Sequence, residues 1–187
     1  MENKNIIALC DYKGIFGSKY YAKPYRSGLD KDILTKEFSK YGYEIRYITF
    51  ADINAQKFSR GEIVIYTSSE DPGYQYKEFI EDIVYYLDIC GVNLIPSFKY
   101  LRANNNKVFM ELLRKLIISS EYQLPTKVFG CYEELIENCS DITFPCVVKE
   151  VKGAGSKGVY ISKNKKELEK VVKKISRTTY YAEDLRD

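Results

Sequence analysis

The side chains that this chain lacks limit the chemistry it can perform. Its 187 residues include 29 lysines and arginines and 26 aspartates and glutamates, but no histidine. Histidine is the base of Ser-His-Asp and Cys-His catalytic sites and a common metal ligand, so sites of these kinds are excluded within the chain. Any chemistry must use lysines, carboxylates, hydroxyl groups and main-chain amides.

The stretch richest in such groups runs from residue 144 to residue 161 and reads FPCVVKEVKGAGSKGVYI. Gly153, Gly155 and Gly158 form a G-x-G-x-x-G pattern, which by itself is weakly specific. Lys149 precedes them on a segment of strand type. A lysine held on a strand can reach phosphate oxygens, and glycines let main-chain amides approach a phosphate. The pattern indicates a phosphate site; the alternative is an ordinary glycine hairpin with an exposed lysine.

The context of the glycines separates the folds that use such a loop. A Rossmann fold requires a helix directly after them, but residues 159–161 are of strand type. A P-loop requires a Lys-Ser/Thr pair after its last glycine, and that pair is missing here. A protein kinase carries its lysine on the strand after the loop, whereas Lys149 lies on the strand before it. The order here is therefore strand, lysine, glycine-rich loop, strand.

From residue 104 onward, this order and several shorter motifs resemble the ATP-grasp superfamily, which includes carbamoyl-phosphate synthases and biotin carboxylases. Asn106-Lys107 at a helix start is similar to the first ATP lysine of that family. Leu124-Pro125-Thr126-Lys127 is similar to its P-x-P-x-T entry into the small lobe, and Phe144–Lys149 to its lysine-bearing strand. An amphipathic helix from Lys166 also has its counterpart there.

The resemblance implies ATP as the nucleotide and Mg²⁺ as the metal ion, with the metal ligands in a second lobe downstream. The complete enzyme would activate a small-molecule carboxylate as an acylphosphate and pass it to an amine or thiol. We expect this chain to stop before the catalytic half, to bind ATP weakly and to lack turnover. The implied ATP-binding residues are Lys107, Lys149, Gly153, Ala154, Gly155, Ser156, Lys157 and Gly158.

The end of the chain leaves one further element of that family open. Thr179–Leu185 is a candidate for the strand that meets adenine, with Glu183 or Asp184 facing the adenine amino group. The alternative is that these residues begin an insertion or a tail.

Upstream of residue 98, apolar runs and helical spacing alternate. Strands are predicted over Asn5–Cys10, Tyr43–Thr49, Glu62–Thr67 and Val92–Ile95. A first helix would bury Leu29, Ile33, Leu34 and Phe38, and a second runs over residues 76–87. Such alternation is typical of a parallel sheet with helices on both faces. We therefore predict an α/β chain: a pre-ATP-grasp domain over residues 1–97, then a helical linker and a small, truncated α+β lobe over residues 98–187.

In the second part, a helix capped by Asn104-Asn105-Asn106 is predicted to run to about Ser119. Its inward face would hold Val108, Leu112, Leu113 and Leu116, and a short strand is predicted over Thr126–Phe129.

Polar residues that follow the first-domain strands are candidates for substrate binding. In open α/β sheets, ligands bind at the carboxyl ends of the strands, which points to the loops after Cys10 and after Thr67. The second loop holds Ser68, Ser69 and Glu70. The alternative is that these serines belong to a capping turn.

Composition bounds the partners and the compartment. The net charge of +3 is too small to indicate nucleic acid. Five cysteines without a C-x-x-C pair fit neither a disulfide framework nor a zinc site. The N-terminus has no signal-peptide core, and no stretch approaches about 18 apolar residues, so we expect a cytoplasmic protein without a membrane partner.

Two functions of different classes remain open on sequence. One is the N-terminal part of an ATP-dependent ligase, and the other is a non-catalytic module that binds a nucleotide or small ligand. A second lobe downstream would favour the ligase. The oligomeric state, a homodimer included, is left open by the sequence.

Overall fold

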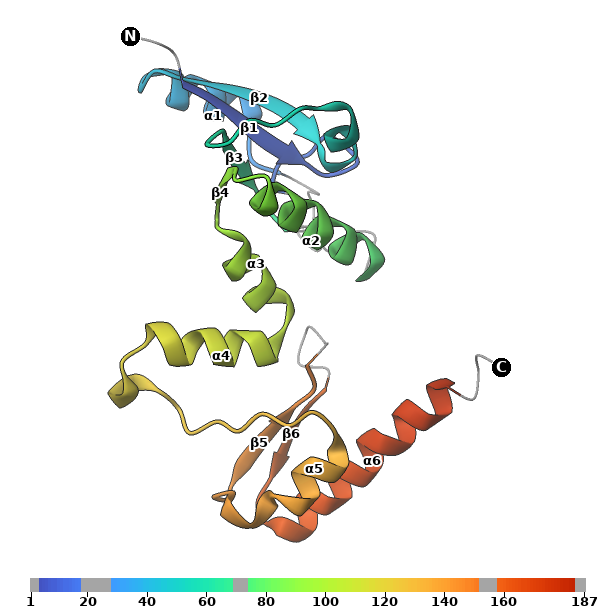
Figure 1. Cartoon of the computed structure of the whole chain (residues 1–187). Coiled ribbons are helices and arrows are strands. Elements are labelled where there is room, and N and C mark those ends of the chain that lie inside the picture. Colours follow the sequence, from blue (N-terminus) through green and yellow to red (C-terminus); the bar gives the residue numbers. More distant parts are fainter. Residues whose placement is uncertain (1–3, 18–27, 69–73, 152–157, 184–187) are drawn as a thin grey trace. The chain divides into compact units, whose positions relative to one another are not determined.

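The computed structural model describes residues 4–17, 28–68, 74–151 and 158–183. The chain divides into two compact units, Met1–Arg102 and Ala103–Asp187, and each is described by itself (Figure 1).

The first unit is built on a parallel sheet of four strands. The strands are β1 (Lys4–Cys10), β2 (Tyr43–Thr49), β3 (Ile63–Tyr66) and β4 (Asn93–Ile95), and their order is β2-β1-β3-β4. Ile6 of β1 lies opposite Ile45 on one side and Ile63 on the other. The predicted parallel sheet is thus confirmed, and all four strands end at one edge.

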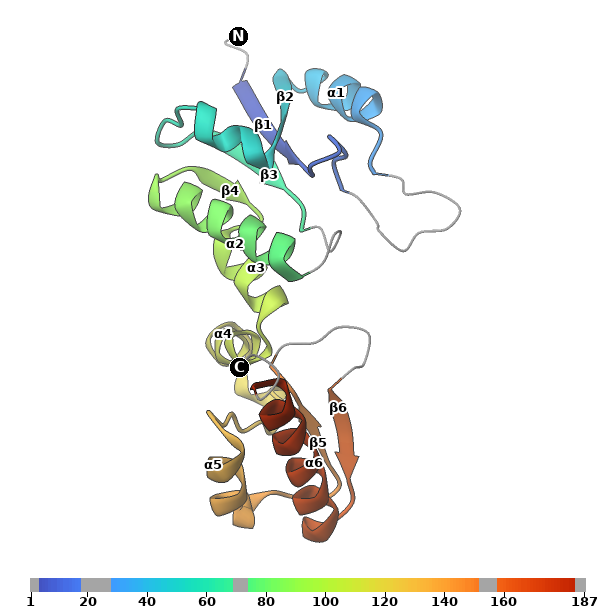
Figure 2. The same ribbon diagram turned by 90° about the vertical axis from the view of Figure 1, so that its right-hand side faces the viewer.

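Helices cover both faces of this sheet (Figure 2). On one face, α2 (Tyr74–Ile89) packs Ile80 and Val84 into a core with Leu9 and Val64. On the other face, α1 (Lys31–Ser39) brings Leu34 against a smaller cluster of Ala8, Cys10 and Phe16. Two shorter elements complete the unit: the 3-10 helix η1 (Phe50–Ala55) and α3 (Phe98–Asn105), whose Leu101 joins the larger core.

The buried face predicted for the first helix is wrong in part. Leu29 and Ile33 are exposed, and no residue of α1 is fully buried. The reason is the start of the helix, since Asp30 is its N-cap and accepts hydrogen bonds from Asp32 N and Ile33 N. Leu29 therefore precedes the helix, and the apolar contact of α1 with the sheet cluster is made by Leu34.

The second unit holds a two-stranded antiparallel sheet covered on one face. The strands β5 (Cys146–Lys149) and β6 (Val159–Ser162) pair with each other. Two helices, α5 (Tyr132–Glu137) and α6 (Lys165–Glu183), pack Leu135, Leu168 and Val172 against it. The unit also contains α4 (Lys107–Ile117) and the 3-10 helices η2 (Ser120–Tyr122) and η3 (Cys139–Asp141).

One predicted strand and one strand candidate of this unit do not form. Thr126–Phe129 forms no strand, and the Thr126 hydroxyl donates instead to Leu124 O at 3.1 Å. Such a local bond competes with strand pairing. Thr179–Glu183 continues α6 as helix, because extending a helix that already exists costs little compared with starting a new element. The remaining residues of the adenine-strand candidate, Asp184 and Leu185, lie outside the described residues.

The inward face predicted for the capped helix is also wrong in part. Asn106 caps α4 by accepting from Phe109 N at 3.0 Å, and Leu113 is buried. Leu112 and Leu116, however, are 47% and 84% exposed. Their side of the amphipathic helix is not covered by the described residues.

The cysteines and the apolar character of the helices complete the picture. The five cysteines are all free thiols. Across the described residues, no helix is both long enough and apolar enough to cross a membrane.

Candidate functional site

The β5-β6 hairpin presents one open face that carries both apolar side chains and a lysine. Alternation along the strands puts Val147, Lys149, Val159 and Ile161 on the side away from the core. Val147 is 55% and Ile161 69% exposed, and these two residues lie opposite each other. Lys149 pairs with Val159 at the end of the hairpin next to the glycine-rich loop. The open face is therefore mainly apolar, with Lys149 at its loop end.

Lys107 reaches the same end of the hairpin from another element. It is the first residue of α4, and its Nζ donates to Glu150 O at 2.8 Å and to Val151 O at 3.4 Å. Glu150 directly follows Lys149 in the sequence. The structure thus places the Lys107 ammonium against the main chain that directly follows Lys149, although the two lysines lie 42 positions apart (149 minus 107).

The loop between the strands is described only at its two ends. Gly153, Ala154, Gly155, Ser156 and Lys157 lie outside the described residues. Gly158 is described and has a φ of +71°. A Cβ there would stand 3.0 Å from Glu150 Cβ, so both the backbone conformation and the close approach require glycine at this position.

Two residues at this end were missed by sequence reasoning. The Tyr160 hydroxyl donates to Glu150 Oε1 at 3.1 Å, and Lys174 Nζ lies 5.8 Å from the Tyr160 ring centroid. The hydrogen bond to the Glu150 carboxylate raises the pKa of Tyr160. Side-chain alternation along β5 and β6 places residues 150 and 160 on the covered face. The sequence alone could not show that they meet, because their contact also depends on the pairing register of the two strands.

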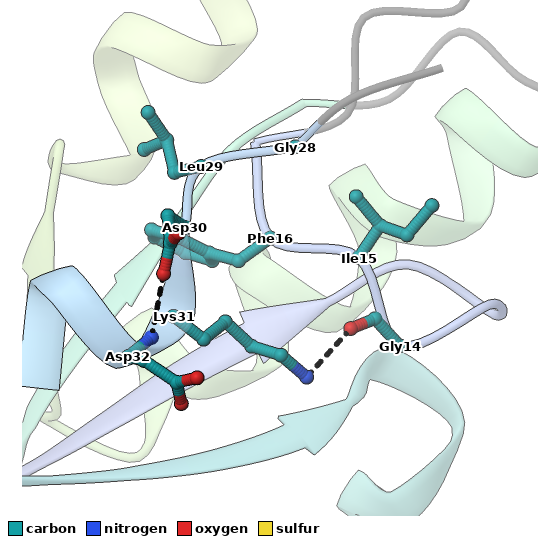
Figure 3. A pocket seen from close by; sticks show the side chains of 8 residues that line it. All are labelled: Gly14, Ile15, Phe16, Gly28, Leu29, Asp30, Lys31 and Asp32. Carbon is teal, nitrogen blue, oxygen red and sulfur yellow. Dashed lines mark hydrogen bonds between the residues drawn. The ribbon is translucent and has the colours of Figure 1, made fainter. Parts of the chain in front are cut away.

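The first unit holds a cavity at the carboxyl end of β1 (Figure 3). Its apolar part comes from Ile15, Phe16 and Leu29, and its polar part from the start of α1. Lys31 Nζ donates to Gly14 O at 3.0 Å, and the Asp30 carboxylate is occupied as the cap of α1. The lining residues are Gly14, Ile15, Phe16, Gly28, Leu29, Asp30, Lys31 and Asp32.

Neighbouring strand ends meet at this edge of the sheet. Asp11 is almost fully buried, and its carboxylate accepts from Lys13 N and Ile15 N at 2.9 Å each. The loop after β1 also contacts the end of β3, because Gly17 N donates to Thr67 Oγ1 at 3.1 Å. The described start of the loop after β1 thus contacts Thr67, which precedes the second loop predicted to bind substrate.

The predicted substrate residues themselves are only partly described. Ser68 lies just after β3, and its buried hydroxyl has no hydrogen-bond partner in the described part of the chain. Ser69 and Glu70 lie outside the described residues. Ser68 is not among the residues that line the cavity at the start of α1.

Comparison with known proteins gives a match over part of the chain. The chain is 32% identical over 85 residues to the formate-dependent phosphoribosylglycinamide formyltransferase of Wigglesworthia glossinidia brevipalpis. The match covers 44% of this chain and 21% of that relative. No family model matches the sequence.

A solved structure that is similar to this chain is the RimK domain protein ATP-grasp from Sphaerobacter thermophilus DSM 20745. The TM-score is 0.47 and the sequence identity 16%, over 90% of this chain and 58% of that one. This chain thus spans less than two thirds of either protein.

The similarity to the formyltransferase is a finding independent of the motifs around Lys107, Lys149 and the glycine-rich loop. The fold agrees with the resemblance, since a parallel α/β unit is followed by a small unit with an antiparallel hairpin. The motifs, the fold and the 85-residue similarity together support the resemblance of the chain to the ATP-grasp superfamily.

Proposed function

We propose that the chain is the N-terminal part of an ATP-dependent ligase that joins a carboxylate to an amine or thiol, and that its second unit binds the nucleotide. The observation that carries the proposal is the meeting of Lys107 with the main chain next to Lys149. Two ammonium groups from different elements at one hairpin end suit a polyanion, because each can contribute a charge-assisted bond to phosphate.

The triphosphate would be held by these two lysines and by main-chain amides of Gly153, Ala154, Gly155, Ser156, Lys157 and Gly158. The conformation of Gly158 supports this, since its positive φ lets the chain return tightly to β6. The open apolar face beside Lys149 would support the base, because a flat apolar surface accepts a nucleobase by stacking.

Magnesium would neutralise part of the phosphate charge in the complete enzyme. The described residues do not fit such a site by themselves, since no group of three His, Cys, Asp or Glu side chains gathers among them. We propose that the magnesium ligands belong to a second ATP-grasp lobe, so that this chain alone binds ATP weakly and does not turn it over.

The carboxylate substrate would bind at the carboxyl edge of the first unit. Ser68, Ser69 and Glu70 remain candidates there, and the buried hydroxyl of Ser68 supports a polar ligand at this edge. The contact between the loops after β1 and β3 also supports a joint site at this edge.

Titration with ATP of the wild-type chain and of Lys149→Ala tests the nucleotide site. Loss of one charge-assisted contact should weaken binding by about 1.5–3 kcal/mol, or roughly ten- to a hundredfold. Lys163→Ala is the matched control, because Lys163 is an exposed lysine of the same unit that follows β6. Equal affinity in Lys149→Ala and in the wild type would remove Lys149 from the site.

A further inference from the structure

Glu150 makes three different hydrogen bonds at the root of the glycine-rich loop. Its carbonyl oxygen accepts from Lys107 Nζ at 2.8 Å. Its amide donates to Gly158 O at 2.8 Å, which closes the loop across the hairpin. Its carboxylate accepts from the Tyr160 hydroxyl at 3.1 Å. One residue therefore joins α4, the residue that ends the loop, and the covered face of β6.

The side chain of Glu150 is anchored away from the open face that carries Lys149. Alternation puts residue 150 on the opposite side of β5 from residue 149. There the carboxylate bonds to Tyr160, and Lys174 lies over the Tyr160 ring. The bond is partly buried and has an ionisable acceptor, two conditions under which a hydrogen bond holds its geometry well.

Lys107 donates to the main-chain carbonyl of Glu150, while the Glu150 carboxylate accepts from the Tyr160 hydroxyl. A carbonyl oxygen directs an ammonium without cancelling its charge, whereas a carboxylate would neutralise it. The position of the carbonyl depends on how β5 ends, and that end is fixed by the bonds of Glu150 to Gly158 and Tyr160. The anchor on the covered face thus sets where the Lys107 ammonium stands.

We propose that Glu150, through its bond to Tyr160, is a positioning residue that holds the Lys107 ammonium and the loop root in place for the phosphates of the nucleotide. This rests on the proposed function for its ligand, but the positioning itself is a property of the free chain. Removing the anchor would release Lys107 without touching the ligand directly.

Lysine reactivity in the free chain tests the positioning. Acetylation by limiting acetic anhydride, followed by mass spectrometry, gives separate rates for Lys107 and Lys149. Because Lys107 is hydrogen-bonded and partly buried, it should react more slowly than the exposed Lys149. Glu150→Ala and Tyr160→Phe should each raise the Lys107 rate about three- to tenfold, the worth of one hydrogen bond. Lys149 should change less than twofold, and Glu150→Gln, which still offers an acceptor to Tyr160, should stay near the wild type.

The affinities for ATP and adenosine test whether the positioning of Lys107 serves phosphate binding. Glu150→Ala and Tyr160→Phe should weaken ATP binding about three- to tenfold and leave adenosine binding unchanged, because the lost contacts serve phosphate. In a chain that already carries Lys107→Ala, the further substitution Glu150→Ala should not weaken ATP binding any more.

Three results would overturn the inference: an unchanged Lys107 rate in both variants, equal losses for ATP and adenosine, or full additivity with Lys107→Ala. Tyr160→Phe removes the same hydrogen bond but keeps the ring beside Lys174. It therefore tests the inference even if Glu150→Ala does not fold. If the wild type binds no ATP, the proposed function fails, and the Lys107 rates still decide whether Glu150 positions that ammonium.

Discussion

At the scale of single residues, the proposed site depends on what surrounds each lysine. Lys149 stands exposed on the open hairpin face, and Lys107 is directed by two carbonyl oxygens. The resemblance to the ATP-grasp superfamily predicted both lysines, because it carries a motif for each. It could not predict Glu150 and Tyr160, since their bond depends on which residues the hairpin register sets on the same face.

Gly158→Ala tests the tight end of the loop. The positive φ alone should cost about 1–2 kcal/mol of unfolding free energy, and the contact of the new Cβ with Glu150 should add to it. Gly42→Ala is the control, because Gly42 has a similar φ of +77° but no atom within 4 Å of the added Cβ. Urea unfolding should show the larger loss for Gly158→Ala. Equal losses of unfolding free energy in the two variants would mean that the close approach to Glu150 does not contribute to the cost of Gly158→Ala.

Tyr76 makes the stability of the first unit depend on pH. Burial raises the pKa of Tyr76 from its ordinary 10.0 to about 12. The folded state then keeps a proton that the unfolded state loses, so this contribution to stability is complete below about pH 10 and is lost as the pH rises through about 12. Urea unfolding at pH 9 and pH 11 should show a smaller loss of stability for Tyr76→Phe than for the wild type. If unfolding free energy fell equally in the wild type and in Tyr76→Phe between pH 9 and pH 11, Tyr76 would ionise in the folded chain as it does in the unfolded chain.

At the scale of elements, the sequence predicted correctly the strands and helices whose apolar pattern matches the core that buries them. The continuous apolar run of β1 and the helical spacing of α2 were predicted correctly, since both are buried by the sheet they build. Thr126–Phe129 was predicted as a strand and forms none. Thr179–Leu185 was a strand candidate through the family resemblance, with a tail or insertion as the alternative, and it is helical as far as Glu183. Strand-type residues need a neighbouring strand to take effect.

The apolar side of α4 shows the same limit. Helical spacing predicted that Leu112, Leu113 and Leu116 face a core, but only Leu113 is buried. Spacing reports that a face is apolar and does not report what covers it.

One substitution at a buried leucine of α4 and one at an exposed leucine measure how much burial contributes to stability. Leu113→Ala should lower the unfolding free energy by about 2 kcal/mol or more, because it leaves a cavity. Leu116→Ala should change it by less than about 0.5 kcal/mol, since the side chain is 84% exposed. Urea unfolding of the two variants checks both values. A loss for Leu116→Ala as large as that for Leu113→Ala would mean that this side of α4 is covered in solution.

At the scale of the whole molecule, the chain corresponds to part of larger proteins. It spans 21% of the length of the formyltransferase it matches. We propose a division of labour in which the first unit offers a substrate edge, the second unit holds phosphates, and a second lobe would supply the metal ligands. Each half of this proposal can fail separately, because substrate and nucleotide are assigned to different units.

The central claim is that ATP phosphates bind at the loop end of the β5-β6 hairpin, and the most direct measurement is an NMR titration of the ¹⁵N-labelled chain with ATP and, separately, with adenosine. Such a titration reports weak binding, with dissociation constants of about 1 mM, residue by residue. ATP should shift the amides of Lys149, Glu150, Gly158 and Val159 more than adenosine does, and Lys149→Ala should reduce these shifts. The account would be contradicted if ATP left these amides unmoved, or if its shifts were confined to the cavity at the start of α1.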